Sequence, residues 1–421
     1  MIRDRARGEN RGYLILLFVL AAFTVRLAAI FALRYHTHPN VWEFDTMAMN
    51  ILEGKGYVYH NLSIDQKLCG YPFFPYFSAL IHWITHRNYL AFEIIQVALA
   101  SLAVIPLAIL TRKLFGLSAS LIAQAAYCLH PGLIVYAGKI HELTLSVFLL
   151  LLICWMVACV KKNTVTVATL GLLIGAGTLL RPTFIFFLPA FFIYVTLTRI
   201  GGRRIAYYTA VATVTSALLM APWIYRGYRL YHRFIFITTS SAEHLWRGNN
   251  PYASGTSLTK DHVDIIAAAG HNFERRLYAL DEMGQYDFFR REALSYIRAQ
   301  PFHFMKMTVK KFVYFWSFSP QAGMEYPPLW LFVYKIIYVF LFAGILAGLY
   351  TIGVNRGVLD MPAIIFLIAF CLMLSLAHAL YYVETRHRWM IEPLLMAFSA
   401  YGYSAVLDKA KAVIANRVTC H

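Results

Sequence analysis

Long apolar runs constrain this chain more than any other feature of its sequence. About ten runs of roughly 20 residues follow one another, and the apolar residues within them are continuous rather than alternating. Such runs predict membrane-spanning helices, because a barrel strand in lipid is shorter and alternates polar with apolar side chains. The expected spans are residues 13–33, 89–110, 118–136, 144–160, 165–180, 183–198, 205–223, 329–351, 361–381 and 389–407. We therefore predict an all-α polytopic membrane protein.

The composition indicates a chain whose solvent is largely lipid. Of the 421 residues, 59% are hydrophobic and 14% are charged, whereas a soluble globular chain is charged at about one residue in four. The formal net charge of +17 would suggest nucleic acid in a soluble protein. In a membrane protein it indicates cytoplasmic anchoring and contact with anionic lipid or phosphate, so we expect no nucleic-acid partner.

Basic residues in the short connecting segments predict the orientation of the spans. Segments 111–117, 161–164, 199–204 and 352–360 all carry Lys or Arg, as cytoplasmic loops do. The apolar run 71–83 is short and contains prolines, and counting it as a span would move most of these charges to the outer face. We therefore expect that run to lie as a helix in the outer interface, and both chain termini to be cytoplasmic.

This topology divides a single transmembrane domain, residues 1–421, into regions. Residues 34–88 are expected to form a first outer loop with interfacial helices, 224–328 a long outer loop, and 329–421 the C-terminal transmembrane helices. The long loop carries charges at helical spacing, which predicts amphipathic helices rather than disorder. No internal repeat or linker composition indicates a second domain.

The first outer loop contains two acids of interest. Asp45 stands at the start of a short helical pattern that Gly54 ends. A carboxylate there could be a plain helix cap, because Asp is a preferred capping residue, or a functional group held by backbone N–H groups. Glu43 lies two residues earlier, and the pair resembles a degenerate D-x-D motif that could hold a divalent metal ion with a phosphate.

Further polar residues fall at the outer ends of the expected spans. Glu142 follows His141 at the first turn of a span, where an acid could be functional or could only complement the helix dipole. Cations on the outer face oppose the usual charge bias, and as a group they suit recognition of a lipid phosphate, although any one could simply contact ordinary headgroups. The candidates are Lys67, Arg181, Arg386 and Arg388, with His141 and His387 beside them.

Several stretches occur in an order that is typical of a known group. They are Glu43-Phe44-Asp45 with Gly54-x-Gly56-Tyr57, Gly70-Tyr71-Pro72-Phe73-Phe74-Pro75, Arg112-Lys113-Leu114-Phe115-Gly116, Pro131 to Gly138 with His141-Glu142, Leu180-Arg181-Pro182-Thr183, Pro222-Trp223, Leu245 to Pro251, and Arg386-His387-Arg388. In this order they resemble the membrane glycosyltransferases of the GT-C superfamily, in particular glycosyltransferase family 39 with its protein O-mannosyltransferases and lipid A aminoarabinose transferases. The resemblance covers about residues 26–403.

The resemblance implies an activity and residue roles. It implies inverting transfer of a hexose or pentose from a polyprenyl-phosphate donor to an acceptor hydroxyl on a lipid, glycan or protein. Asp45 would be the general base with Glu43 beside it, Glu142 a second acid in the same cleft, and the outer cations would hold the phosphate. The expected location is a bacterial inner membrane, with the site on the outer face.

Two other interpretations stay open from the sequence. An O-antigen ligase or polymerase would also have a long outer loop with arginines, and it would depend on residues in 224–328 rather than on Asp45. A flippase or transporter for lipid-linked sugar would need ionisable groups near the bilayer midplane, where this chain has little besides Arg26.

Overall fold

The computed structural model describes the backbone of residues 2–318 and 328–419 and the side chains of residues 12–318 and 328–411. Within these ranges the chain is helical apart from loops and one short hairpin of β1 (Tyr59–Asn61) and β2 (Ile64–Gln66). The helices before the long outer region are α1 (Ile2–Ala32), α2 (Glu43–Leu52), α3 (Phe73–Ile84), α4 (Tyr89–Leu102), α5 (Val104–Phe115), α6 (Leu117–Leu129), α7 (Pro131–Ala137), α8 (Leu143–Cys159), α9 (Thr164–Leu180), the 3-10 helix η1 (Pro182–Phe186), α10 (Phe187–Leu197) and α11 (Gly202–Tyr231). The later helices are α12 (Ser240–Gly248), α13 (Ile265–Ala268), α14 (His271–Tyr278), α15 (Glu282–Ala299), α16 (Pro301–Trp316), α17 (Pro328–Asn355), α18 (Met361–Leu380), α19 (Thr385–Trp389) and α20 (Glu392–Thr419).

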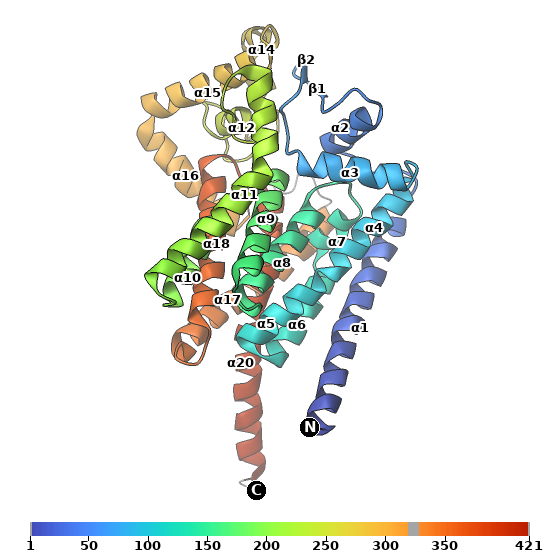
Figure 1. Ribbon diagram of the computed structural model, residues 1–421, viewed down its shortest axis with the longest axis vertical. Coiled ribbons are helices and arrows are strands. Elements are labelled where there is room, and N and C mark those ends of the chain that lie inside the picture. The colour runs from blue at the N-terminus through green and yellow to red at the C-terminus, as the bar shows by residue number, and fades with distance from the viewer. Residues whose placement is uncertain (1, 319–327, 420–421) are drawn as a thin grey trace.

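Apolar helices pack side by side along the long axis of the molecule, which confirms the predicted all-α membrane fold (Figure 1). In the described part of the chain, five segments are long and apolar enough to cross a membrane, or six if the pair α6–α7, bent by 55°, counts as one. The helices α8, α9 and η1 with α10 are apolar but shorter. The figure of about ten spans stays a prediction, because it depends on how these shorter helices sit in lipid.

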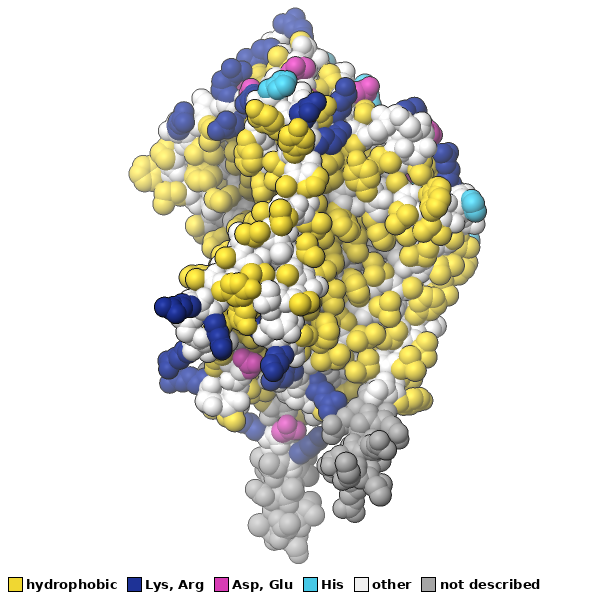
Figure 2. All heavy atoms as spheres, viewed as in Figure 1, with side chains coloured by type: hydrophobic (Ala, Val, Ile, Leu, Met, Phe, Trp, Pro, Cys, Tyr) yellow, Lys and Arg dark blue, Asp and Glu magenta, His cyan; other side chains and the backbone are white. Residues whose placement is uncertain are grey.

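The surface of the bundle is divided into an apolar middle and charged ends. Figure 2 shows hydrophobic side chains over the middle of the visible face, with Lys and Arg gathered toward both ends. Leu20 of α1, Leu218 of α11 and Phe340 of α17 are among the exposed apolar side chains. Both chain ends lie at one end of the molecule, and α2, α12 and α14 lie at the other (Figure 1). This arrangement suits a bundle that carries its termini on one side of a membrane and its large loops on the other.

Small residues let two pairs of helices approach closely. A Cβ added at Gly171 of α9 would come within 2.4 Å of the Ala212 carbonyl oxygen on α11. A Cβ added at Gly348 of α17 would come within 2.1 Å of the Phe398 carbonyl oxygen on α20. Contacts that close leave no room for a larger residue, as is typical of helix pairs in membranes. The first pair fixes α9 against α11, and therefore fixes the start of the turn at Arg181 that follows α9.

The two regions predicted to be outer loops cover the end of the bundle opposite the chain termini (Figure 1). The expected interfacial run is α3, which lies across the ends of the neighbouring helices rather than along them (Figure 1). The helix α11 continues to Tyr231, so the long outer region begins later than the predicted residue 224, and α11 ends where His232 adopts a left-handed backbone with φ of 51°. Residues 319–327 of the predicted loop lie outside the described residues.

Glu282 of α15 joins the long outer region to the first outer loop. Its carboxylate accepts hydrogen bonds from the backbone N–H groups of Lys67 (2.6 Å) and Leu68 (2.9 Å) and from the Thr239 hydroxyl (2.7 Å). The Tyr231 hydroxyl donates to the same carboxylate. The two loops therefore form one outer layer, and the backbone of Lys67 belongs to the contact between them.

Candidate active site

A cavity of about 330 Å³ lies between the outer layer and the ends of the spans. Residues from α2, the turn before α8, the turn after α9, α12 and the α18–α19 connection line it. The sequence candidates that line the cavity are Glu43, His141, Glu142, Arg181, Arg386 and His387. The candidates that are not among its lining residues are Asp45, Lys67 and Arg388.

The orientation of α2 separates the two acids of the first loop. The helix begins at Glu43, earlier than the predicted start at Asp45, and the Asp45 side chain is buried. Asp45 Oδ1 lies 2.7 Å from His82 Nε2, and Asp45 Oδ2 accepts a hydrogen bond of 2.9 Å from the Tyr89 hydroxyl. These contacts hold α2 against α3 and α4, so the Asp45 side chain joins three helices instead of capping α2.

Glu43 lines the cavity from the first turn of α2. Burial raises its pKa above the usual range for a glutamate, although a backbone hydrogen bond and the nearby His141 and Arg386 act in the opposite direction. A carboxylate with a raised pKa accepts a proton more readily than an ordinary one. Glu43 therefore has the properties expected of a general base.

Glu142 has the opposite electrostatic character, although it lines the same cavity. It is buried just before α8, with Oε2 2.7 Å from His141 Nδ1 and Oε1 3.6 Å from Arg181 Nη2. Burial alone would raise its pKa, but His141, Arg181 and Arg386 lower the pKa to about 2. Glu142 therefore stays ionised at neutral pH, and it orients the cations around it rather than accepting a proton.

Two arginines bring positive charge to the cavity. Arg181 follows α9 directly, and besides its approach to Glu142 its Nη1 lies 3.5 Å from Met390 Sδ. Arg386 of α19 forms an ion pair of 2.6 Å with Glu384, and its guanidinium carbon lies 4.8 Å from the centre of the Trp42 ring. Guanidinium groups in such partly desolvated positions bind phosphate oxygens strongly, because the planar fork matches the geometry of the anion.

Another wall of the cavity carries imidazole rings. His244 of α12 and His378 from the last turn of α18 line it together with His387. The rings of His378 and His387 stack, with centroids 4.3 Å apart and planes inclined by 19°. Of these three histidines only His387 was predicted from the sequence, since His244 falls just before the Leu245–Pro251 motif and is not part of it. His378 could have been found by its place at the outer end of an apolar span, where a titratable residue is unusual.

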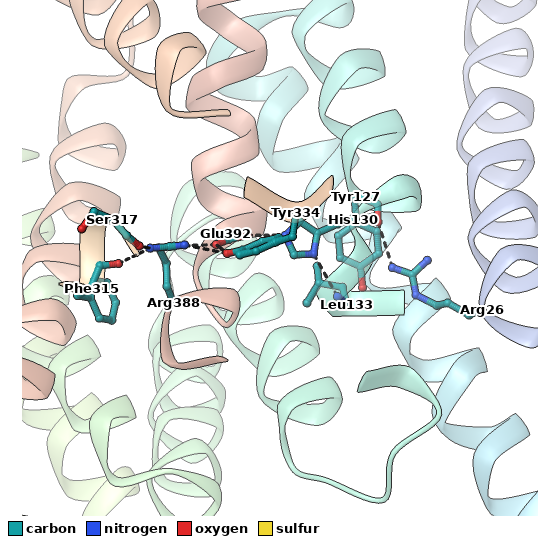
Figure 3. A network of polar contacts seen from close by, with 9 residues as sticks. All are labelled: Arg26, Tyr127, His130, Leu133, Phe315, Ser317, Tyr334, Arg388 and Glu392. Carbon is teal, nitrogen blue, oxygen red and sulfur yellow. Dashed lines mark hydrogen bonds and ion pairs between the residues drawn. The ribbon is translucent and has the colours of Figure 1, made fainter. Parts of the chain in front are cut away.

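Arg388 belongs to a separate, closed network (Figure 3). Its Nη1 donates to the carbonyl oxygens of Phe315 and Ser317, both at 2.6 Å. Its Nε donates to Glu392 Oε1 at 2.8 Å, and its Nη2 donates to the Tyr334 hydroxyl at 2.8 Å. The side chain is 1% exposed, so it is engaged with protein atoms rather than with the cavity.

The structure does not assemble the predicted metal pair. Glu43 lines the cavity, whereas both oxygens of Asp45 are engaged by His82 and Tyr89. Among the residues that the structure describes, no group of three or more His, Cys, Asp or Glu side chains is arranged to hold a metal ion. Glu43 and Asp45 therefore do not fit a shared divalent ion.

Comparisons with known proteins agree with this architecture. Residues 70–225 match the family described as dolichyl-phosphate-mannose-protein mannosyltransferase. The oligosaccharyltransferase AglB of Archaeoglobus fulgidus, in complex with an inhibitory peptide and a dolichol-phosphate, has a TM-score of 0.56 at 14% identity, over 98% of this chain and 52% of that chain. A structure of the Archaeoglobus fulgidus oligosaccharyltransferase with Zn and sulfate has a TM-score of 0.57 at 16% identity, over 97% and 51% of the two chains.

ArnT from Cupriavidus metallidurans, bound to undecaprenyl phosphate, has a lower TM-score of 0.43 at 12% identity, over 93% of this chain and 78% of that chain. No curated protein sequence matches the chain. The chain spans about half the length of the archaeal oligosaccharyltransferase. The fold and the family match confirm the resemblance to the GT-C superfamily that the sequence motifs indicated.

Proposed function

We propose that this protein is a glycosyltransferase that moves a hexose or pentose from a polyprenyl-phosphate donor to an acceptor hydroxyl. The observation that carries the proposal is one cavity that holds Glu43, a half-buried acid with a raised pKa, together with Arg181 and Arg386. A hydroxyl nucleophile needs a base within reach, and a departing phosphate needs fixed positive charge. The cavity provides groups of both kinds.

An apolar hollow beside the cavity supports a lipid-linked donor. It has a volume of about 530 Å³ and lies between α3, α9 and α11. Phe73, Leu179 and Trp223 line it from these three helices. Pro72 lines the hollow while its neighbour Tyr71 lines the cavity, so the two spaces adjoin at the start of α3. A prenyl chain in the hollow would leave its phosphate near the arginines of the cavity.

The proposed reaction is a single displacement. The ionised Glu43 takes the proton of the acceptor hydroxyl while that oxygen forms a bond to the anomeric carbon of the sugar. The bond from the anomeric carbon to the phosphate oxygen breaks, and its electron pair leaves with the polyprenyl phosphate. Arg181 and Arg386 stabilise the charge that develops on the leaving phosphate, and Glu142 orients Arg181.

The family resemblance implied Asp45 as the general base, whereas this proposal assigns that role to Glu43. Asp45 would have to exchange its contacts with His82 and Tyr89 for a substrate hydroxyl, and it lies outside the cavity lining. Its role in the proposal is to hold α2 so that Glu43 faces the cavity. The predicted outer-face site in a bacterial inner membrane, with cytoplasmic termini, remains part of the proposal.

The proposal is tested with purified protein in liposomes that contain a polyprenyl-phosphate-linked hexose or pentose and a hydroxyl acceptor on a lipid, glycan or peptide. We expect a covalent product together with free polyprenyl phosphate, in amounts that rise with the acceptor concentration. Movement of the donor between leaflets without any covalent product would contradict the proposal and would support a flippase instead.

A further inference from the structure

The imidazole wall of the cavity has no part in the displacement described above. It comprises His244, His378 and His387, with Tyr381 and Tyr382 beside them. The three histidines come from separate elements, α12, α18 and α19, and meet only in the folded chain. His244 also packs edge-on against Tyr382, with ring centroids 5.6 Å apart. Five ring side chains on one wall of a small cavity form a surface that can both stack and hydrogen-bond.

The hydrogen-bonding state of the wall is partly determined by the protein. His387 Nδ1 accepts a hydrogen bond of 3.2 Å from the Glu384 backbone N–H, so in the neutral ring the proton resides on Nε2. His378 Nε2 is buried and has no hydrogen-bond partner within the part of the chain that the structure describes. An unpaired buried polar atom costs free energy, so a ligand atom that pairs with it gains affinity.

Burial and nearby charges favour the neutral form of two of the wall histidines. The pKa of His387 is lowered well below the usual range by burial, and further by His378, Arg181, Arg386 and His244. The pKa of His244 is lowered by burial and by Arg247 and Arg386, with Glu243 and Glu384 acting in the opposite direction. A neutral imidazole offers one donor and one acceptor, which is the combination that a sugar hydroxyl can satisfy.

We propose that His244, His378 and His387 bind the hydroxyls of the sugar that the donor carries, and that this wall selects an uncharged sugar over a cationic aminosugar. The inference rests on the proposed function, because the sugar is placed by its bond to a phosphate held at Arg181 and Arg386. A sugar ammonium group at this wall would meet imidazole rings and the two nearby arginines, while the carboxylates Glu142 and Glu384 are already paired with His141 and Arg386. An uncharged sugar hydroxyl meets matched donors and acceptors there.

The experiment measures donor binding without an acceptor, so it does not depend on turnover. The probes are undecaprenyl phosphate, undecaprenyl phosphate linked to a neutral hexose, and undecaprenyl phosphate linked to an aminopentose. For the unmodified protein we expect the neutral glycosylated lipid to bind about tenfold more tightly than the bare phosphate. We expect the aminopentose lipid to show no such gain. Equal affinity for all three lipids, or tightest binding of the aminopentose lipid, would overturn the proposal.

Variants then assign any gain to the wall. In His378→Phe and His244→Phe the ring shape is kept and the polar atoms are removed, so we expect the tenfold gain to vanish while the affinity for bare undecaprenyl phosphate stays unchanged. His303→Phe, on the exposed surface of α16, is the matched control and should keep the gain. Retention of the gain in both wall variants would overturn the proposal, as would an equal loss of affinity for all three lipids. If the protein binds the neutral glycosylated lipid more tightly but transfers no sugar, the proposed function is rejected and the sugar-binding role of the histidines is kept.

Discussion

Two regions of this molecule are built from the same residue types and differ in how completely those residues are paired. In the buried network of Figure 3, Glu392 meets Arg388, Tyr334 and His130, and every one of these contacts joins protein groups. In the cavity, Glu142 meets His141, and Arg181 approaches it only to 3.6 Å. A closed network stabilises one arrangement of the chain, whereas an open one keeps binding capacity for a ligand.

The difference also gives the two regions different tasks in the fold. Arg388 binds the last carbonyl groups of α16 through Phe315 and Ser317, so it ties the long outer region to α19. Arg386 lies two residues earlier on α19 and lines the cavity. The closed network thus holds the short helix that presents a cavity arginine. Loss of a closed-network residue should destabilise the protein, and loss of a cavity residue should impair binding and transfer.

The largest expected effect is on stability and comes from the closed network. Arg388→Met leaves Glu392 buried without its arginine partner, and breaking a buried pair in this way costs about 3–5 kcal/mol. We expect the free energy of unfolding in detergent to fall by that amount. Arg298→Met, on the exposed surface of α15, is the matched control and should change the stability little. Equal stability of the two variants would show that the network is not closed as described.

The next effect is on transfer and comes from the open region. Arg181→Met removes a guanidinium that we propose to bind the donor phosphate, and we expect the rate of sugar transfer to fall about 100-fold, as for loss of one charge-stabilising group elsewhere. Arg181→Lys should recover part of the rate, because it keeps the charge without the planar fork. The free energy of unfolding should change less than for Arg388→Met. If Arg181→Met lowered the free energy of unfolding as much as Arg388→Met but left the specific activity of the folded protein unchanged, the assignment of the two regions would be contradicted.

A smaller effect is expected in the pH profile. In its proposed role Glu43 accepts a proton only when ionised, so transfer should fall as the pH drops through its raised pKa, and the acid limb should lie at higher pH than for an ordinary glutamate. Arg386 helps to lower this pKa. In Arg386→Gln the residual rate should therefore show an acid limb displaced to higher pH. A displacement of the acid limb to lower pH, or no displacement, would show that Arg386 does not lower the pKa of the group whose ionisation controls transfer.

The sequence predicted much of the fold and of the cavity lining. Continuous apolar runs indicated the helical bundle, and the prolines and short length of residues 71–83 indicated the helix that lies across it. Topology alone brought Glu43, Glu142 and Arg181 to one face, and they meet in one cavity. The short helices α8 and α9, and η1 with α10, lie close to the predicted spans 144–160, 165–180 and 183–198. The bend between α6 and α7 was not predicted, because it depends on packing against neighbouring helices.

The sequence could not choose between neighbours on one helix. Residues two apart on a helix point about 200° away from each other, so only one of Glu43 and Asp45 faces the cavity, and only one of Arg386 and Arg388. The choice for α2 is made by His82 and Tyr89, which engage Asp45 from α3 and α4. No local pattern around residue 45 contains that information, because it arises from tertiary contacts.

The most direct test of this account is a comparison of Glu43→Gln with Asp45→Asn in sugar transfer by purified protein. We predict that Glu43→Gln lowers the transfer rate about 100-fold or more, since a general base contributes at least that much. Asp45→Asn keeps a polar group between His82 and Tyr89, and we predict a loss of less than about tenfold. The opposite order, with transfer abolished in Asp45→Asn and retained in Glu43→Gln, would contradict the assignment of Glu43 as the base.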